Sequence, residues 1–133
     1  MNYSSKRIEK TCKYIMFTYV IFIFDTGTLL NVKLDGDAKL AQISKEGYYY
    51  LNSVLVNGKE NWMQYQGSNA IWYDNHYKTW NIGAKNNLGT SRYSLCSTND
   101  AIRPEEVTSW IVNLDKNGRW MKTTKVFGSI SKY

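Results

Sequence analysis

The strongest constraint on the fold lies in residues 71–83, which read IWYDNHYKTWNIG. Two runs that favour β-structure, 71–73 and 79–82, flank a polar tip at 74–78. Wide aromatic rings fit a pleated, half-buried surface, so two such runs around a polar tip predict a β-hairpin. Similar units precede and follow this one. The chain is therefore predicted to be mainly β, a small antiparallel meander of hairpins that forms an open sheet or a partly closed barrel.

Length and composition set the class of protein. A chain of 133 residues is long enough for one domain with its own hydrophobic core. Aromatic residues make up 15% of it, which excludes a disordered chain because this much apolar surface offsets the entropy of ordering. The formal net charge of +6 is unevenly placed: residues 1–25 carry +2, and the remaining +4 is diffuse. A nucleic-acid-binding surface needs basic residues clustered on one face, so we expect no nucleic-acid partner.

Residues 1–34 differ in character from the rest and are predicted to be a separate leader. A basic stretch precedes residues 14–24, an apolar run without a charged residue. This layout is typical of a secretory signal peptide or an imperfect anchor, and it predicts a secreted protein. The alternative is a buried β-strand in a cytoplasmic protein, because Tyr, Phe, Ile and Val dominate the run. The run is shorter than the roughly 20 residues that a membrane-spanning helix needs. Membrane contact is expected only through this segment, if it is not cleaved.

A short motif within the leader allows a catalytic alternative. Phe24-Asp25-Thr26-Gly27-Thr28 resembles the Asp-Thr-Gly loop of aspartic proteases, in which two carboxylates share one proton. The sequence holds one such loop, so only a homodimer would assemble the pair, as retroviral proteases do. Asp-Thr-Gly is also ordinary turn chemistry. The motif therefore predicts a protease only if its structural context is present.

The rest of the chain divides into a solvated linker, residues 35–46, and a β-rich module, residues 47–133. Asn57-Gly58 is the strongest hairpin signal in the module, because a type I′ turn requires positive φ at both central positions. Pro104 followed by two acids predicts one short helical turn at 104–107, the only helix that we expect in the module. Further strands are expected at 48–56, 59–66, 91–97, 110–114 and 119–122.

A series of short motifs runs from Gly47 to Phe127. They are Asn57-Gly58-Lys59, Ile71-Trp72-Tyr73-Asp74, Trp80-Asn81-Ile82-Gly83 and Pro104-Glu105-Glu106-Val107-Thr108-Ser109-Trp110. The series resembles an uncharacterised β-rich, Trp- and Tyr-rich module that recurs singly or in tandem in larger eukaryotic proteins. The family has no agreed activity. The resemblance implies a β-module that starts near Gly47, and it favours a binding role.

Residues that carry catalysis or bind metals are sparse. His76 is the only histidine and sits at a predicted hairpin tip, where a solvated turn residue is expected. Cys12 and Cys96 would pair only if the leader is retained in an oxidising compartment. One histidine and two distant cysteines do not complete a tetrahedral zinc site, and no nucleotide fingerprint occurs, so we expect no metal and no cofactor. The acidic residues expected in turns and caps are Asp74, Asp100, Glu105 and Glu106.

The aromatic residues are the remaining candidates for function. Trp72 and Trp80 are predicted to lie on one face of the central hairpin as a cross-strand pair. At least three of the five tryptophans are expected in the core, and any exposed one is expected to stack on a ligand, with residues 48–50 as neighbours. The predicted binding residues are Trp72, Trp80, Tyr73, Tyr77 and Trp62.

The sequence therefore favours a non-catalytic module that binds a protein or a glycan through aromatic side chains. Two alternatives stay open. One is a homodimeric aspartic protease that uses Asp25. The other is an intracellular structural or interaction fragment that has no ligand of its own.

Overall fold

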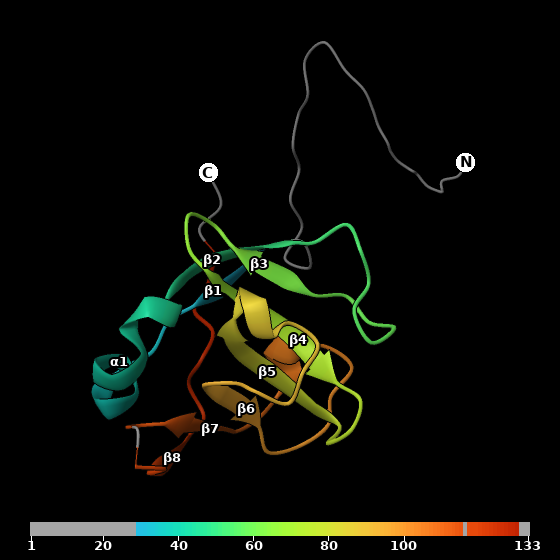
Figure 1. The fold of residues 1–133 in the computed structure, drawn as a ribbon. Helices are drawn as coiled ribbons and strands as arrows, with labels where there is room; N and C mark the ends of the chain where they lie inside the picture. The colour runs from blue at the N-terminus through green and yellow to red at the C-terminus, as the bar shows by residue number, and fades with distance from the viewer. Residues whose placement is uncertain (1–28, 116, 131–133) are drawn as a thin grey trace.

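The structure is a computed structural model, and it describes residues 29–115 and 117–130. Eight strands form one curled, open antiparallel sheet, and their order in the sheet follows their order in the sequence (Figure 1). The strands are β1 Leu29–Val32, β2 Gly47–Leu51, β3 Trp62–Gln64, β4 Asn69–Asp74, β5 Thr79–Ala84, β6 Leu95–Ser97, β7 Trp110–Asn113 and β8 Trp120–Thr123. The predicted β-meander is confirmed.

The hairpin turns form where the sequence predicts them. Asn57 and Gly58 have φ angles of 54° and 75°, the left-handed values that a type I′ turn requires, and Val56 bridges to Lys59 across the turn. The central hairpin pairs β4 with β5 over six residue pairs, from Asn69 with Ala84 to Asp74 with Thr79. The last hairpin pairs β7 with β8. The residues in these turns therefore determine where the chain reverses direction.

The register of the central hairpin corrects one prediction. Trp80 lies opposite Tyr73, while Trp72 lies opposite Asn81. Successive side chains of a strand point to opposite faces, so Trp72 and Trp80 face opposite sides of the sheet rather than pairing on one. Trp80 packs edge-on against Tyr73, with ring centroids 5.2 Å apart. Trp80 therefore faces the inside of the curled sheet and Trp72 the outside.

The core fills the inside of the curl. Three tryptophans lie in it, and Trp62 and Trp80 meet edge-on with centroids 6.0 Å apart. The buried core residues are Leu30, Val32, Leu34, Ala38, Tyr49, Trp62, Ile71, Tyr73, Trp80, Ile82, Leu95, Val107, Trp110, Val112 and Val126. Residues from the first strand to the end of the described chain share this core, so the part of the chain that the structure describes folds as one unit.

The chain forms regular structure before Gly47, where the module was expected to start. β1 lies within the predicted leader, yet it pairs along its whole length with β2. The predicted linker contains α1 Gly36–Gln42 and a 3₁₀ turn, η1 Ile43–Lys45. Two further 3₁₀ turns are η2 Lys85–Asn87 and η3 Pro104–Glu106, and only the last was expected. The chain is therefore ordered into this fold well before Gly47.

Tertiary contacts explain why α1 forms in a segment without a strong helical pattern. Ala38 is fully buried, and the Gln42 side-chain amide donates a hydrogen bond of 2.7 Å to the carbonyl of Asn113 in β7. Figure 1 shows α1 beside the β7–β8 hairpin. Short helices gain most of their stability from packing rather than from propensity. This helix closes one end of the curled sheet.

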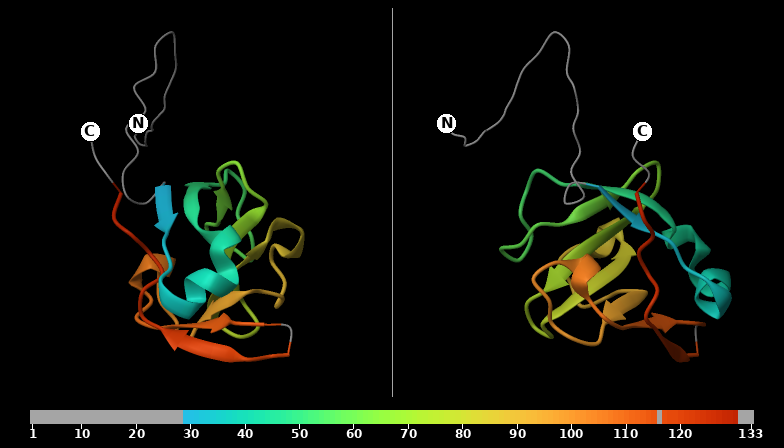
Figure 2. Two further views of the ribbon diagram at one scale, coloured as in Figure 1. Left: turned by 90° about the vertical axis from the view of Figure 1, so that its left-hand side faces the viewer. Right: turned by 180° about the vertical axis from the view of Figure 1, so that it is seen from behind.

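The C-terminal segment covers the free edge of β1. The Lys33 amide donates to the Val126 carbonyl at 2.7 Å, and the Gly128 amide donates to the Asn31 carbonyl at 2.9 Å. Both views of Figure 2 show this red segment running beside the blue first strand. An uncovered strand edge would present unpaired backbone groups to other chains. The two ends of the described chain therefore protect one another.

The part of the chain that the structure describes contains no helix long and apolar enough to cross a membrane.

Replacing Val126 with Ala tests whether this closing segment belongs to the core. Val126 is 2% exposed, so we expect the free energy of unfolding to fall by about 1–3 kcal/mol, from lost burial and the cavity left behind. Val54→Ala is the matched control, because Val54 is 64% exposed and its loss is expected to change stability by less than about 0.5 kcal/mol. Urea denaturation measures both. Equal stability of the two variants would contradict the closure.

Candidate functional site

Four of the five predicted binding residues are buried. Trp62, Trp72, Trp80 and Tyr73 are each at most 4% exposed. Their polar atoms have protein partners: Trp72 Nε1 donates to the Thr90 carbonyl at 2.9 Å, and Trp80 Nε1 to the Ala101 carbonyl at 2.8 Å. Direct stacking of a ligand on these four rings is incompatible with their burial. They stabilise the fold instead.

Tyr77 is the one predicted binding residue that the structure exposes, at 62%. It lies at the tip of the central hairpin, where its ring meets that of His76 with centroids 4.4 Å apart. The Asp74 carboxylate organises this tip by accepting a hydrogen bond of 2.8 Å from the His76 amide. His76 and Asp74 therefore have the turn roles that their positions predict.

A loop that follows β5 buries Trp72 on the outside of the sheet. The loop returns to the sheet where the Ser94 amide donates to the Ile82 carbonyl at 2.9 Å. Gly83 allows this close approach, because a Cβ there would lie 3.1 Å from both Trp72 Cη2 and Tyr93 Cα. The absence of a side chain at Gly83 thus leaves room for the backbone of Tyr93 to lie over the sheet.

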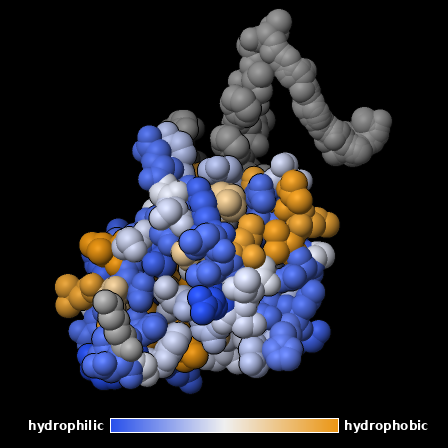
Figure 3. Space-filling model, in the orientation of Figure 1, coloured by the Kyte–Doolittle hydropathy of each residue, from blue (hydrophilic) through white to orange (hydrophobic). Residues whose placement is uncertain are grey.

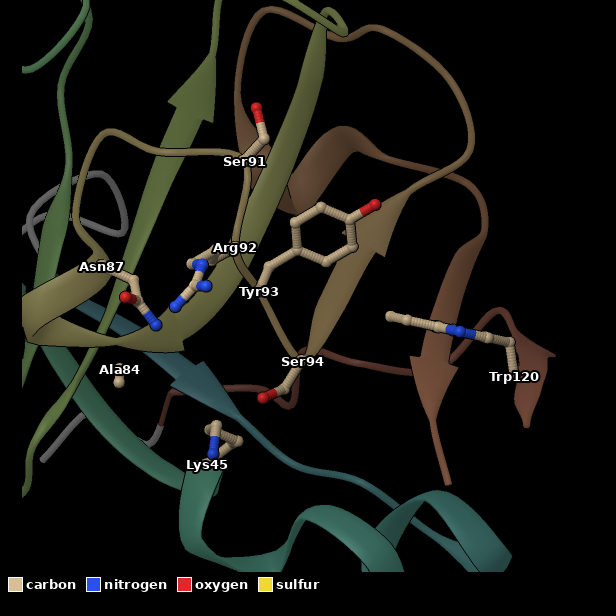
Figure 4. Close-up of a pocket in the computed structure, with 8 residues that line it drawn as sticks. All are labelled: Lys45, Ala84, Asn87, Ser91, Arg92, Tyr93, Ser94 and Trp120. Atoms are coloured by element: carbon tan, nitrogen blue, oxygen red, sulfur yellow. The ribbon is translucent and has the colours of Figure 1, made fainter. Parts of the chain in front are cut away.

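A pocket of about 470 Å³ opens beside this loop. Its lining comes from segments far apart in the sequence: η1, the end of β5, η2, the loop before β6, and β8. The lining residues are Lys45, Ala84, Asn87, Ser91, Arg92, Tyr93, Ser94 and Trp120 (Figure 4). The volume falls in the range of about 300–1,000 Å³ that is usual for small-molecule sites. This pocket is the candidate functional site.

Trp120 is the exposed tryptophan of the described chain, at 41%. Its ring meets that of Tyr93 edge-on, with centroids 5.8 Å apart. The sequence predicts that an exposed tryptophan would stack on a ligand, but it did not single out Trp120 or Tyr93. The sequence contained one indication that Trp120 is exposed. Trp120 follows a polar turn and lies between Arg119 and Met121-Lys122, in a predicted strand near the end of the chain.

The Tyr93 side chain is partly buried at the pocket wall. Burial, together with a hydrogen bond to the Cys96 thiol, raises the pKa of Tyr93 to about 12. Burial also raises the pKa of Cys96, so the thiol stays protonated and is not an activated nucleophile. Cys96 therefore acts as a buried apolar residue that anchors the ring at the pocket wall.

The pocket carries positive charge. Lys45 and Arg92 line it, and no acidic residue does. Burial lowers the pKa of the Lys45 ammonium, because the charged form loses hydration. The neighbouring Glu46 carboxylate does not turn to Lys45, since it lies 3.3 Å from Lys39 Nζ and accepts a hydrogen bond from the Leu34 amide.

The acidic residues elsewhere have structural partners. Asp100 accepts a hydrogen bond of 3.0 Å from the Tyr73 hydroxyl, and Glu105 pairs with Arg103 at 2.9 Å. Within residues 29–115 and 117–130, no group of three or more His, Cys, Asp and Glu side chains is placed to hold a metal ion. Asp25, Cys12 and the apolar run 14–24 lie outside the described residues.

Comparisons with protein-family models, with curated proteins and with solved structures gave no match.

A pH titration of stability tests the burial of Tyr93. The unfolded chain loses the Tyr93 proton near the usual pKa of 10, while the folded chain keeps it until about pH 12. The unfolded state thus binds fewer protons in this window, and the free energy of unfolding falls as pH rises through it. We expect Tyr93→Phe to make this fall less steep in urea denaturation at pH 9–12. The slope will not reach zero, because burial also raises the pKa of Tyr49 and Tyr73. An unchanged slope in Tyr93→Phe would contradict the raised pKa.

Proposed function

We propose that this protein is a non-catalytic binding module that holds a glycan in the pocket beside Trp120. One observation carries the proposal. The exposed tryptophan stands against a second ring, Tyr93, at a pocket whose remaining lining is polar or small. A sugar presents an apolar C–H face to a ring and hydroxyl groups to amide and hydroxyl side chains.

The polar lining favours a glycan over a protein partner. Asn87, Ser91 and Ser94 supply side-chain donors and acceptors around the rings. The centre of a protein interface is instead a well-packed, desolvated apolar cluster. On the face drawn in Figure 3, apolar side chains form separate groups within a hydrophilic surface rather than one continuous patch.

The lining also supports the absence of catalysis. Glycoside hydrolysis normally uses two carboxyl groups across the bond that is cleaved, and the pocket lining contains no carboxyl group. It contains no histidine and no thiol that would act as a base or nucleophile. The geometry therefore supports retention of a sugar rather than its conversion.

Trp120→Ala tests the proposal. A panel of neutral and acidic oligosaccharides on an array first identifies a ligand, and calorimetry then measures its affinity for the full chain. We expect Trp120→Ala to weaken binding by about tenfold, at the lower end of the roughly 1–3 kcal/mol that stacking of a nucleic-acid base on an aromatic ring contributes. Trp120→Phe is expected to retain part of the affinity.

Tyr65→Ala is the matched control, because Tyr65 is an exposed ring that does not line the pocket. Its affinity is expected to equal that of the unchanged protein. Full affinity in Trp120→Ala, in a protein of unchanged stability, would overturn the proposal.

A further inference from the structure

The positive charge of the pocket indicates which class of sugar it would bind. We infer that the ligand carries an anionic substituent, a carboxylate or a sulfate on the sugar ring, which Lys45 and Arg92 bind while Trp120 stacks on the ring. This inference rests on the proposed function, because it concerns the same pocket.

The first support is the pairing of the charges. Lys45 and Arg92 form no ion pair with any residue between 29 and 130 that the structure describes, whereas Arg103 pairs with Glu60 at 3.1 Å and Arg119 pairs with Asp115. The Lys45 ammonium has one polar side-chain contact, the Ser44 hydroxyl at 3.3 Å. Both cations are therefore available to a ligand.

The second support is their placement. Figure 4 shows Lys45 and Arg92 on one side of Ser94 and Trp120 on the other. A ligand that spans the pocket thus meets positive charge at one end and an aromatic ring at the other. A uronic acid or a sulfated sugar has this arrangement, because its anionic group projects from the edge of a ring whose face is apolar.

The third support is energetic. Lys45 is partly buried, and burial disfavours its charge as long as no counter-charge is near. An anion in the pocket would compensate for the lost hydration. Arg92 adds a planar guanidinium fork that matches the two oxygens of a carboxylate or sulfate. A neutral sugar does not supply this compensation.

The test compares sugars that differ only in charge, using the full chain and calorimetry at low salt. One pair is an oligogalacturonide and its methyl ester, in which the carboxylate is neutralised while the ring is kept. The other pair is dextran sulfate and dextran of equal length. We expect the charged member of at least one pair to bind at least tenfold more tightly, and the pair that shows this preference identifies carboxylate or sulfate as the substituent.

Variants assign the effect to the two cations. Lys45→Met and Arg92→Gln are each expected to weaken binding of the charged sugar by about three- to tenfold, in the range of charge-assisted hydrogen bonds that are partly exposed. Lys45→Arg keeps the charge and is expected to keep most of the affinity. Lys125→Gln removes one positive charge outside the lining and is expected to leave the affinity unchanged.

The outcomes separate the two proposals. Equal affinity for both members of each pair, with Trp120→Ala still weakening both, would overturn the anionic ligand and keep the glycan site. Binding of none of the four sugars, and of no oligosaccharide on the array, would overturn both. A poly-glutamate peptide that binds in their place, with loss of binding in Lys45→Met, would assign the pocket to an acidic protein segment and overturn the sugar.

Discussion

The pairing of β4 with β5 is the contact on which the rest of the structure depends. Every residue of β4 is buried, which is unusual for a strand of an antiparallel meander, where one face commonly meets water. Its inward side chains, Ile71 and Tyr73, enter the core, and its outward Trp72 lies beneath the loop that follows β5. The hairpin is therefore covered on both faces, and it lies in the middle of the eight-stranded sheet.

Burial of the outer face has a direct consequence for the site. A ring at Trp72 on the outside must be covered, and Gly83 next to it leaves room for the covering loop to approach. The loop in turn carries Arg92 and Tyr93 to the pocket wall. The loop that covers Trp72 therefore also forms part of the pocket wall. Packing of the outer face and the proposed site thus depend on the same loop.

Much of the fold was predictable because its signals are local. Asn57-Gly58 fixes one turn through its φ angles, and the aromatic runs around 74–78 fix another. The helix α1 was not predictable, because the partner of Gln42 is Asn113, which is 71 residues away. The sequence prediction placed Trp72 and Trp80 on the same face of the sheet, which is wrong. The face of each side chain depends on the register between β4 and β5, and a shift of one residue reverses it. The positions of the aromatic residues in the sequence do not specify this register.

The site was less predictable than the fold for the same physical reason. Its lining residues come from η1, the end of β5, η2, the loop before β6, and β8, and only the folded sheet brings these segments together. A ligand that contacts both Lys45 and Trp120 would link η1 to the last hairpin, β7–β8. Such a ligand would bind the folded state alone, so it would stabilise the folded sheet by mass action. Under the proposed function, binding would therefore be coupled to folding, although the core rings and the pocket rings are different residues.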